Sequence, residues 1–171
     1  MKEPYGMTVF CDDIRDEVSN KKTYVGVYAG EMIVGDGLPA MVPSLGLAIK
    51  YLEPFDMPVQ PVSIRVFAPG EGGDSEVLVD VELPADRPQR PLGNQTDPLA
   101  EFRAHMLDFR FSPLLIKAEG HIKVRAYVGD EEKEIRLGSL RIRKLTSEDG
   151  AHSDQVQVLE SRAKAGKRAT F

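Results

Sequence analysis

The stretch FCDDIRDEV at residues 10–18 holds the side chains with the most obvious capacity for chemistry. Its carboxylates are those of Asp12, Asp13, Asp16 and Glu17, with Arg15 between them. Carboxylate oxygens are the ligands that calcium and magnesium prefer, so one hypothesis is a metal-assisted hydrolase that uses these four acids. Their spacing differs from that of the calcium-binding loop, which needs acids at alternate positions, a central glycine and a distant glutamate.

A local structural interpretation explains the same residues more simply. Asp13 can cap a single helical turn, in which Asp16 occupies the third position. Ile14 and Val18, four residues apart, would then both face the core. Arg15 can pair with a neighbouring acid. We favour this structural turn, while the metal hypothesis stays open and predicts that the carboxylates converge in a cleft.

Nucleophilic catalysis finds little support elsewhere in the chain. Cys11 lies within an apolar run, where cysteine is usually a small buried hydrophobe. It is the only cysteine, so an intrachain disulfide and a multi-cysteine zinc site are excluded. The histidines, His105, His121 and His152, are scattered, and His121 alternates outward to solvent. With no GxSxG, HExxH or phosphate-loop signature, the sequence predicts no catalytic residue, no cofactor and no metal.

The C-terminal residues are basic and form the one feature that suggests a polyanion. The charges are those of Arg162, Lys164, Lys167 and Arg168. Weak contact with nucleic acid is one hypothesis, but four charges give little affinity at physiological salt. The formal net charge of −5 also disfavours nucleic-acid binding by the whole protein. We therefore favour a solubilising terminus.

Alternation of apolar and polar residues dominates the rest of the chain. The alternating segments are 44–52, 61–68, 75–83 and 120–128. Each pattern is typical of an antiparallel strand with one buried face and one wet face. Segments 6–11 and 23–34 are rich in β-branched and aromatic residues and also favour strands. Between residues 135 and 142 the apolar residues move from odd-numbered positions (Ile135, Leu137) to even-numbered ones (Leu140, Ile142). A bulge at Gly138-Ser139 would keep all of them on the core face.

These elements predict an all-β fold of about eight or nine strands. Turn residues at 69–74 and 129–133 indicate hairpins. The expected architecture is a two-layer antiparallel β-sandwich, immunoglobulin-like or C2-like, that occupies residues 1–145. One short helix is predicted at 97–105, after a proline-rich crossover loop at 83–96. Residues 146–171 are predicted to be a mostly disordered tail.

Charged residues on the outward positions of these strands have mixed signs. The basic ones are Lys50, Arg65, Arg125, Arg141 and Arg143, and the acidic ones are Asp80, Glu82 and Glu134. Charges directly opposite one another on neighbouring strands attract. Cross-strand ion pairs are therefore the expected role of these residues.

The same sequence bounds the setting of the protein. No apolar run reaches the length of about 18 residues that a membrane helix needs, and the first residues do not form a signal peptide. The single cysteine fits a reducing compartment. A cytoplasmic protein with no membrane partner is expected.

The segments FCDDIRDEV, TYVGVYAGEMIV and GHIKVRAYVGDEEKEIRLGSLRI together carry a family resemblance. They resemble a family of small uncharacterised bacterial proteins whose N-terminus runs Phe-Cys-Asp-Asp-Ile-Arg-x-Glu, followed by a Gly-x-Tyr strand. In this chain those motifs are Phe10–Glu17 and Gly26–Tyr28. The resemblance covers roughly residues 5–145 and implies a domain of unknown function. It supplies no activity, cofactor or catalytic residue.

The favoured function is a non-catalytic binding or interaction module. Such a domain binds a protein or a small ligand through its end loops or a sheet edge, and its open edges also offer a route to homo-oligomers. The alternatives are the metal-assisted hydrolase and the nucleic-acid contact described above.

Overall fold

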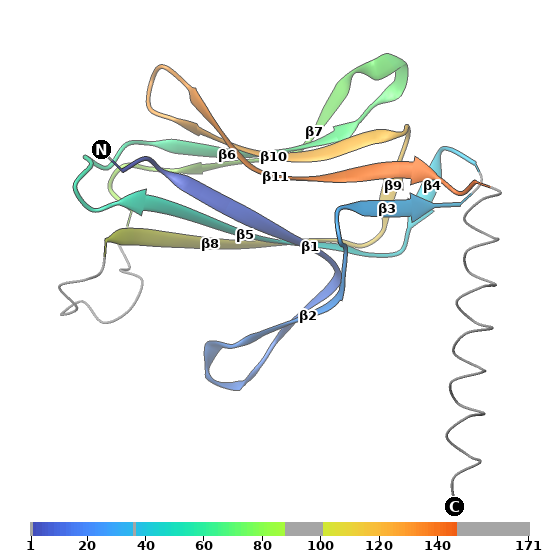
Figure 1. The fold of residues 1–171 in the computed structure, drawn as a ribbon, viewed down its shortest axis with the longest axis horizontal. Coiled ribbons are helices and arrows are strands. Elements are labelled where there is room, and N and C mark those ends of the chain that lie inside the picture. The colour runs from blue at the N-terminus through green and yellow to red at the C-terminus, as the bar shows by residue number, and fades with distance from the viewer. Residues whose placement is uncertain (1, 36, 88–100, 147–171) are drawn as a thin grey trace, which may run out of the picture.

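The protein is built almost entirely of β-strands, as a computed structural model of residues 2–35, 37–87 and 101–146 shows (Figure 1). No α-helix occurs in these ranges; the helical elements there are two single 3-10 turns, Val18–Asn20 and Glu71–Gly73. The expected tail after residue 146 and most of the crossover loop lie outside the described residues.

The strands form two main sheets. The four-stranded sheet has the order β2 (Lys22–Val27), β1 (Tyr5–Asp16), β5 (Leu45–Pro54), β8 (Phe102–Phe111). The five-stranded sheet has the order β3 (Glu31–Val34), β11 (Lys133–Lys144), β10 (Gly120–Val128), β6 (Val62–Pro69), β7 (Ser75–Leu83). A small third sheet pairs β4 (Ala40–Val42) with β9 (Leu114–Ile116). Neighbouring strands are antiparallel except β3 and β11, which run parallel.

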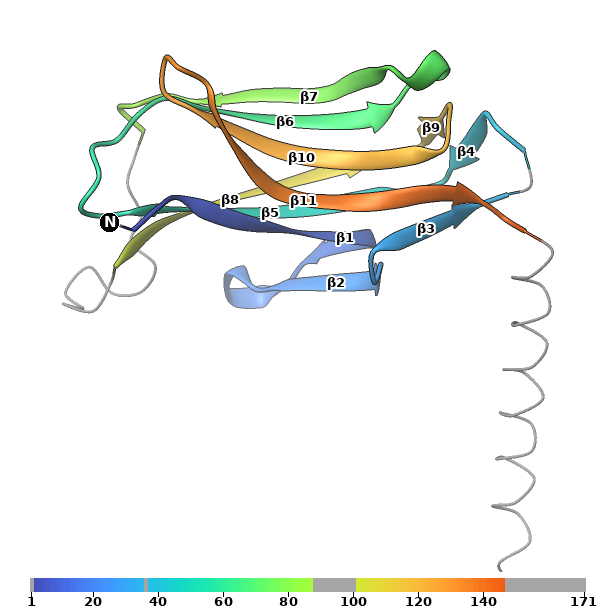
Figure 2. The ribbon, with the colours of Figure 1, turned by 45° about the horizontal axis from the view of Figure 1, so that its top comes forward.

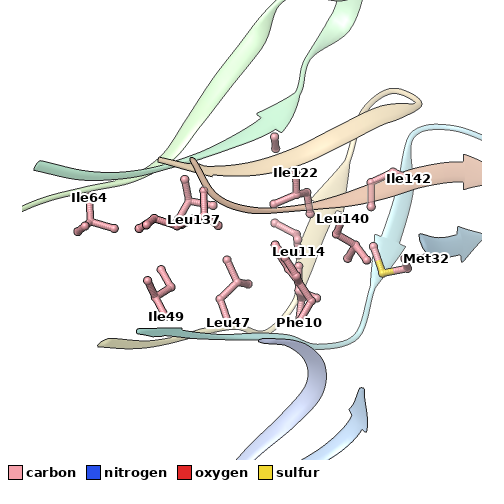
Figure 3. Packing of buried hydrophobic residues seen from close by; sticks show 14 of the residues in the cluster. Phe10, Met32, Leu47, Ile49, Ile64, Leu114, Ile122, Leu137, Leu140 and Ile142 are labelled. Atoms are coloured by element: carbon pink, nitrogen blue, oxygen red, sulfur yellow. The ribbon is translucent and has the colours of Figure 1, made fainter. Parts of the chain in front are cut away.

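The two main sheets lie in two layers with the hydrophobic core between them (Figures 2 and 3). Leu47 and Ile49 of β5 point towards Leu137 and Ile64 of the opposite layer (Figure 3). All four side chains are almost completely excluded from solvent. Burial of such side chains supplies about 1.5–3 kcal/mol each relative to exposure, so this interlayer contact is the main stabilising feature of the fold.

The alternation in the sequence predicted the strands well. Segments 44–52, 61–68, 75–83 and 120–128 correspond to β5, β6, β7 and β10. The hairpins at 69–74 and 129–133 join β6 to β7 and β10 to β11, as expected.

A bulge in β11 is confirmed, but it lies just before the predicted Gly138-Ser139, since Ser139 pairs regularly with Lys123. The register shifts where Val124 faces Gly138 and Arg125 faces Arg136, so Leu137 is the extra residue. This single insertion lets Leu137 and Leu140 both reach the core, with 2% and 0% of their surface exposed.

The predicted helix at 97–105 is wrong where the structure describes it. Residues 97–100 lie outside the described residues, but Phe102–His105 begin β8 and pair with Tyr51–Pro54 of β5. Asp97 and Pro98 gave a helix-start signal. That signal is weak, and a long-range strand pairing readily overrides local helix propensity.

Candidate functional site

The acidic segment belongs to an extended strand rather than to a turn. β1 continues to Asp16, and its second half pairs with β2, with Ile14 opposite Tyr24 and Asp16 opposite Lys22. The helical turn predicted from Asp13 is therefore wrong, because hairpin pairing with β2 satisfies this backbone. Val18, expected in the core, is 86% exposed.

Ile14 is buried as expected, but in a second, smaller cluster outside the main core. It packs with Cys11 and Ala48, and partly buried Tyr24 lies against them. Cys11 is fully buried, which confirms its expected role as a small hydrophobe. Burial, together with the charges of Asp12 and Asp13, raises the pKa of the Cys11 thiol. A raised pKa keeps the thiol protonated and a poor nucleophile.

Asp12 is held by a tyrosine rather than by other acids. The Tyr28 hydroxyl donates a hydrogen bond to Asp12 Oδ1. Burial and this hydrogen bond raise the pKa of Tyr28. Gly26, at φ +64°, lies directly against the Asp12 carboxylate, and a Cβ there would overlap it. The exposed Asp12 side chain therefore lies at the surface against Gly26 and Tyr28 of the neighbouring segment.

The remaining acids of the segment have partners of their own. Asp13 pairs with Arg15 at 3.1 Å, which confirms the expected local pair. Asp16 pairs with Lys22 and with Arg110 at 3.1 Å. The hydrogen bond from Lys22 is the main reason that the pKa of Asp16 is lowered.

These pairs fasten the β1–β2 hairpin to the far edge of its sheet. Lys22 also contacts Asp108 of β8 at 2.9 Å, and Arg110 donates from Nε to the carbonyl of Ile14 at 3.1 Å. Glu17 is exposed, and its amide donates to the Lys21 carbonyl at 2.8 Å. The hairpin therefore bends across the outer face of the four-stranded sheet, below the rest of that layer in Figure 1.

The structure does not bring the four carboxylates together in a shared cleft. Among residues 2–35, 37–87 and 101–146, no group of three or more histidine, cysteine or acidic side chains could hold a metal ion. Each acid whose side chain makes a contact makes it with a basic or hydroxyl group. The arrangement suits a structural role in the hairpin.

A second charged cluster, which sequence reasoning missed, lies buried between the layers. Glu53 of β5 binds Arg87 through Oε1 and His105 Nε2 through Oε2, the latter at 2.9 Å. Arg103 of β8 lies with its Nε 3.9 Å from Glu53 Oε2. We call these four residues the Glu53 cluster. Their side chains are at most 11% exposed.

Both arginines of the Glu53 cluster also bind backbone carbonyls. Arg87 Nη1 donates to the carbonyls of Gln60, Leu83 and Pro84 at 2.8–3.0 Å. Arg103 Nη2 donates to those of Pro54 and Met57 at 2.7–2.8 Å. The cluster thus ties together β5, β8 and the chain that leaves β7, at the end of the layers where β8 begins (Figure 1).

The environment of Glu53 favours its ionised form. Burial alone would raise the pKa of Glu53, but hydrogen bonds from His105 and Arg87 outweigh burial and lower it. Tyr51 stacks on His105 with ring centroids 6.0 Å apart, and burial raises the pKa of its hydroxyl. Because these charges are buried, removing one member of the Glu53 cluster would leave the others without their partner in a site that water solvates poorly.

One signal in the sequence could have revealed the Glu53 cluster. Glu53 has the same parity as the buried residues Leu47, Ile49 and Tyr51 of β5. Arg103 and His105 likewise share parity with the apolar residues of 107–111. Reading 102–111 as a strand would have placed these charges on inward positions, whereas the helix interpretation concealed them.

Most outward charges form the cross-strand pairs that were expected. Arg65 binds Asp80 at 3.0 Å, and Arg125 binds Glu134 at 3.0 Å. Glu82 makes no such pair within the described ranges, and neither does Lys50, which has no hydrogen-bond or ion-pair partner there. It lies between Met7 of β1 and Met106 of β8 in the strand register.

No protein-family model matches the chain, and neither the curated proteins nor the solved structures include a significant match. The resemblance based on Phe10–Glu17 stays a prediction. Within the part of the chain that the structure describes, no helix combines the length and apolar character needed to cross a membrane.

Proposed function

We propose that the protein is a non-catalytic β-sandwich binding module, immunoglobulin-like or C2-like, that contacts a protein partner through the outer face of its four-stranded sheet. The supporting observation is the row Met7, Lys50, Met106 across β1, β5 and β8. The two methionines are 59% and 62% exposed. Exposed apolar groups gathered on one face mark interaction sites.

The row is part of a larger apolar surface. Tyr5 is 51% exposed and packs edge-on against Phe102, with ring centroids 5.2 Å apart. Tyr5 lies opposite Leu52, and Leu52 opposite Ala104, two residues along the strands from the methionine row; Leu52 itself is covered, with 5% of its surface exposed. We call this surface, from Tyr5 and Met7 to Phe102 and Met106, the methionine face.

Lys50 indicates the chemistry of the partner. Its aliphatic stem lies among apolar neighbours, while its ammonium lacks a counter-charge within the described residues. A partner segment that carries apolar side chains and one carboxylate would cover the methionines and pair with Lys50. Methionine side chains adapt to differently shaped partners, which suits a binding surface.

The other part of the proposal is the absence of a catalytic role. Its support is that the two groups of charged side chains described above make structural contacts: the acidic segment in the β1–β2 hairpin, and the Glu53 cluster between the layers. A cytoplasmic setting is part of the same proposal, and the buried free thiol of Cys11 supports it.

Photo-crosslinking tests this function. A photoreactive residue placed at Met106 should trap a reproducible partner in the cells that produce the protein. The same residue at Met41, which is 60% exposed on β4, is the control position and should trap none in common. Lys50→Glu should reduce the Met106 adduct roughly tenfold by like-charge repulsion.

The purified partner should then bind the wild-type chain directly and Lys50→Glu more weakly. Identical adducts from positions 106 and 41, or an adduct at 106 that Lys50→Glu leaves unchanged, would contradict the proposal.

A further inference from the structure

The outer face of the five-stranded sheet carries a stripe of basic side chains along β10 and β11. Val124 and Ala126 of β10 are fully buried, so the residues between and beside them point outward. The outward positions of the two strands hold one acid, Glu134, and five basic residues, Lys123, Arg125, Arg136, Arg141 and Arg143. This local excess of positive charge contrasts with the net charge of −5 of the whole chain.

The strand register brings these charges into adjacent rows. The rows, each formed by one residue of β10 and its partner on β11, are Arg125–Arg136, Lys123–Ser139 and His121–Arg141. Residues directly opposite each other on one face have Cβ atoms about 5 Å apart, and like charges there repel. Successive outward residues are about 7 Å apart along a strand, so the three rows form one continuous surface. We call this surface the basic stripe.

The acids beside the basic stripe neutralise only part of its charge. Glu31 of β3 accepts two hydrogen bonds from Arg143, through Nε and Nη2, both at 3.1 Å. Glu134 is shared, at 3.0 Å from Arg125 and 3.9 Å from Arg136. The Arg136 side chain is 84% exposed, so its guanidinium is accessible to a second carboxylate.

The middle of the basic stripe has no such partners. Within the described residues, the side chains of Lys123, His121 and Arg141 take part in no hydrogen bond or ion pair. His121 and Arg141 are exposed, and Lys123 is partly buried. Glu119, at the start of the same hairpin, pairs with Lys144 at 3.6 Å. An anionic group placed over the middle of the stripe would therefore meet two cations that hold no other partner in the described ranges.

The neighbours of the basic stripe indicate a protein segment rather than a nucleic acid. Lys123 lies opposite Phe67 of β6, and Phe67 lies opposite Val77 of β7, which is 52% exposed. Nucleic-acid strands gain affinity by stacking bases on open aromatic rings. The ring of Tyr127, which also points outward from β10, is covered by Arg65, whose guanidinium carbon is 4.6 Å from the ring centroid. An acidic protein segment offers carboxylates for the cations and apolar side chains for Phe67 and Val77.

We propose that the basic stripe is a second interaction surface, which binds an acidic segment of a partner protein. Lys123 and Arg141 take the carboxylates of that segment, with Arg136 beside them. The two main sheets are opposite layers (Figure 2), so the basic stripe and the methionine face lie on opposite sides of the molecule. The inference goes beyond the proposed function, because a module with both surfaces can bridge two partner segments.

The test measures binding of the full-length protein to a blocked, dye-labelled peptide of alternating glutamate and valine by fluorescence anisotropy. Wild type should bind the peptide, and more weakly as salt rises, because the contacts involve exposed charges. Lys123→Glu and Arg141→Glu should each weaken binding roughly tenfold by like-charge repulsion. Lys21→Glu makes the same charge change at an exposed position of the β1–β2 hairpin, and it should leave the affinity within about twofold of wild type.

Other outcomes overturn the inference. No binding by the wild type, or equal losses in Lys123→Glu, Arg141→Glu and Lys21→Glu, would remove the basic stripe as a site. A loss confined to Lys50→Glu would place the peptide on the methionine face instead. Tighter binding of a thymidine oligonucleotide, lost in Lys123→Glu, would assign the stripe to a nucleic acid. A wild-type dimer that Lys123→Glu dissociates in sedimentation would assign it to a second copy. None of these results changes the expected Met106 crosslink, so the proposed function fails or stands separately.

Discussion

The acidic segment at 12–17 and the Glu53 cluster use similar side chains in opposite settings. In the acidic segment, Asp16 meets Lys22 and Arg110 at the surface, with 66% of the Asp16 side chain exposed. In the Glu53 cluster, Glu53 meets Arg87 and His105 with only 6% of its side chain exposed. The segment that is conspicuous in the sequence is thus the weaker electrostatic feature, since water screens its charges.

Burial, rather than local density of charge, decides what these charges do. Removing a surface partner leaves a carboxylate that water can solvate. Removing Glu53 leaves two arginines and a histidine without their shared anion in a closed site. Removing a charge from the Glu53 cluster should therefore lower the free energy of unfolding much more than removing a charge from the acidic segment.

The largest expected effect is that of Glu53→Gln. This change keeps the shape of the side chain and removes its charge, and it should lower the free energy of unfolding by about 3–5 kcal/mol. Urea unfolding followed by circular dichroism measures the loss. Glu82→Gln is the matched control, because Glu82 is exposed on β7, and it should change stability little. Equal losses in the two variants would remove the distinction between buried and exposed charge.

The pH dependence of that loss sharpens the comparison. Because the pKa of Glu53 is lowered in the folded protein, its contribution is complete above the unfolded value of about 4.3. It falls as the pH drops through the folded pKa. The stability difference between wild type and Glu53→Gln should therefore be constant near neutral pH and shrink below about pH 4. A difference that grows in acid would contradict the assigned sign.

A smaller effect is expected for Asp16→Asn. The pairs with Lys22 and Arg110 are exposed, so the melting temperature should fall by about 2 °C or less. The fall should diminish in high salt, which screens surface charges. Asp130→Asn, in the exposed β10–β11 hairpin, is the control. A loss comparable with that of Glu53→Gln would show that the hairpin charges are a principal support of the fold.

Sequence patterns were sufficient for the strands because period-two alternation reports burial directly. They revealed β5, β6, β7 and β10. They also indicated a bulge in β11, placed at Gly138-Ser139 rather than at Leu137 where it occurs, because a one-residue insertion is the simplest cause of a change of parity. The patterns failed where a local helix-start signal competed with pairing to a strand that is distant in the sequence. Asp97-Pro98 indicated a helix, but pairing with β5 makes Phe102–His105 a strand.

In the candidate sites, too, local contacts could be predicted from the sequence, whereas contacts between distant segments could not. The pairing of Asp13 with Arg15 is local, and the sequence predicted that Arg15 pairs with a neighbouring acid. The contacts of Asp12 with Tyr28 and of Asp16 with Arg110 depend on how β1 and β2 bend across the sheet. The sequence likewise treated Lys50 as one cross-strand charge among several, since only the register shows that its neighbours are Met7 and Met106.

Calorimetric titration of the full-length protein with calcium, magnesium and manganese tests the central claim most directly, namely that the acidic segment holds the hairpin and binds no metal. At millimolar metal, wild type and the Asp12→Asn/Asp16→Asn double variant should both give only heats of dilution. Saturable binding of one ion by the wild-type chain, lost in the double variant, would contradict the account and restore the metal site.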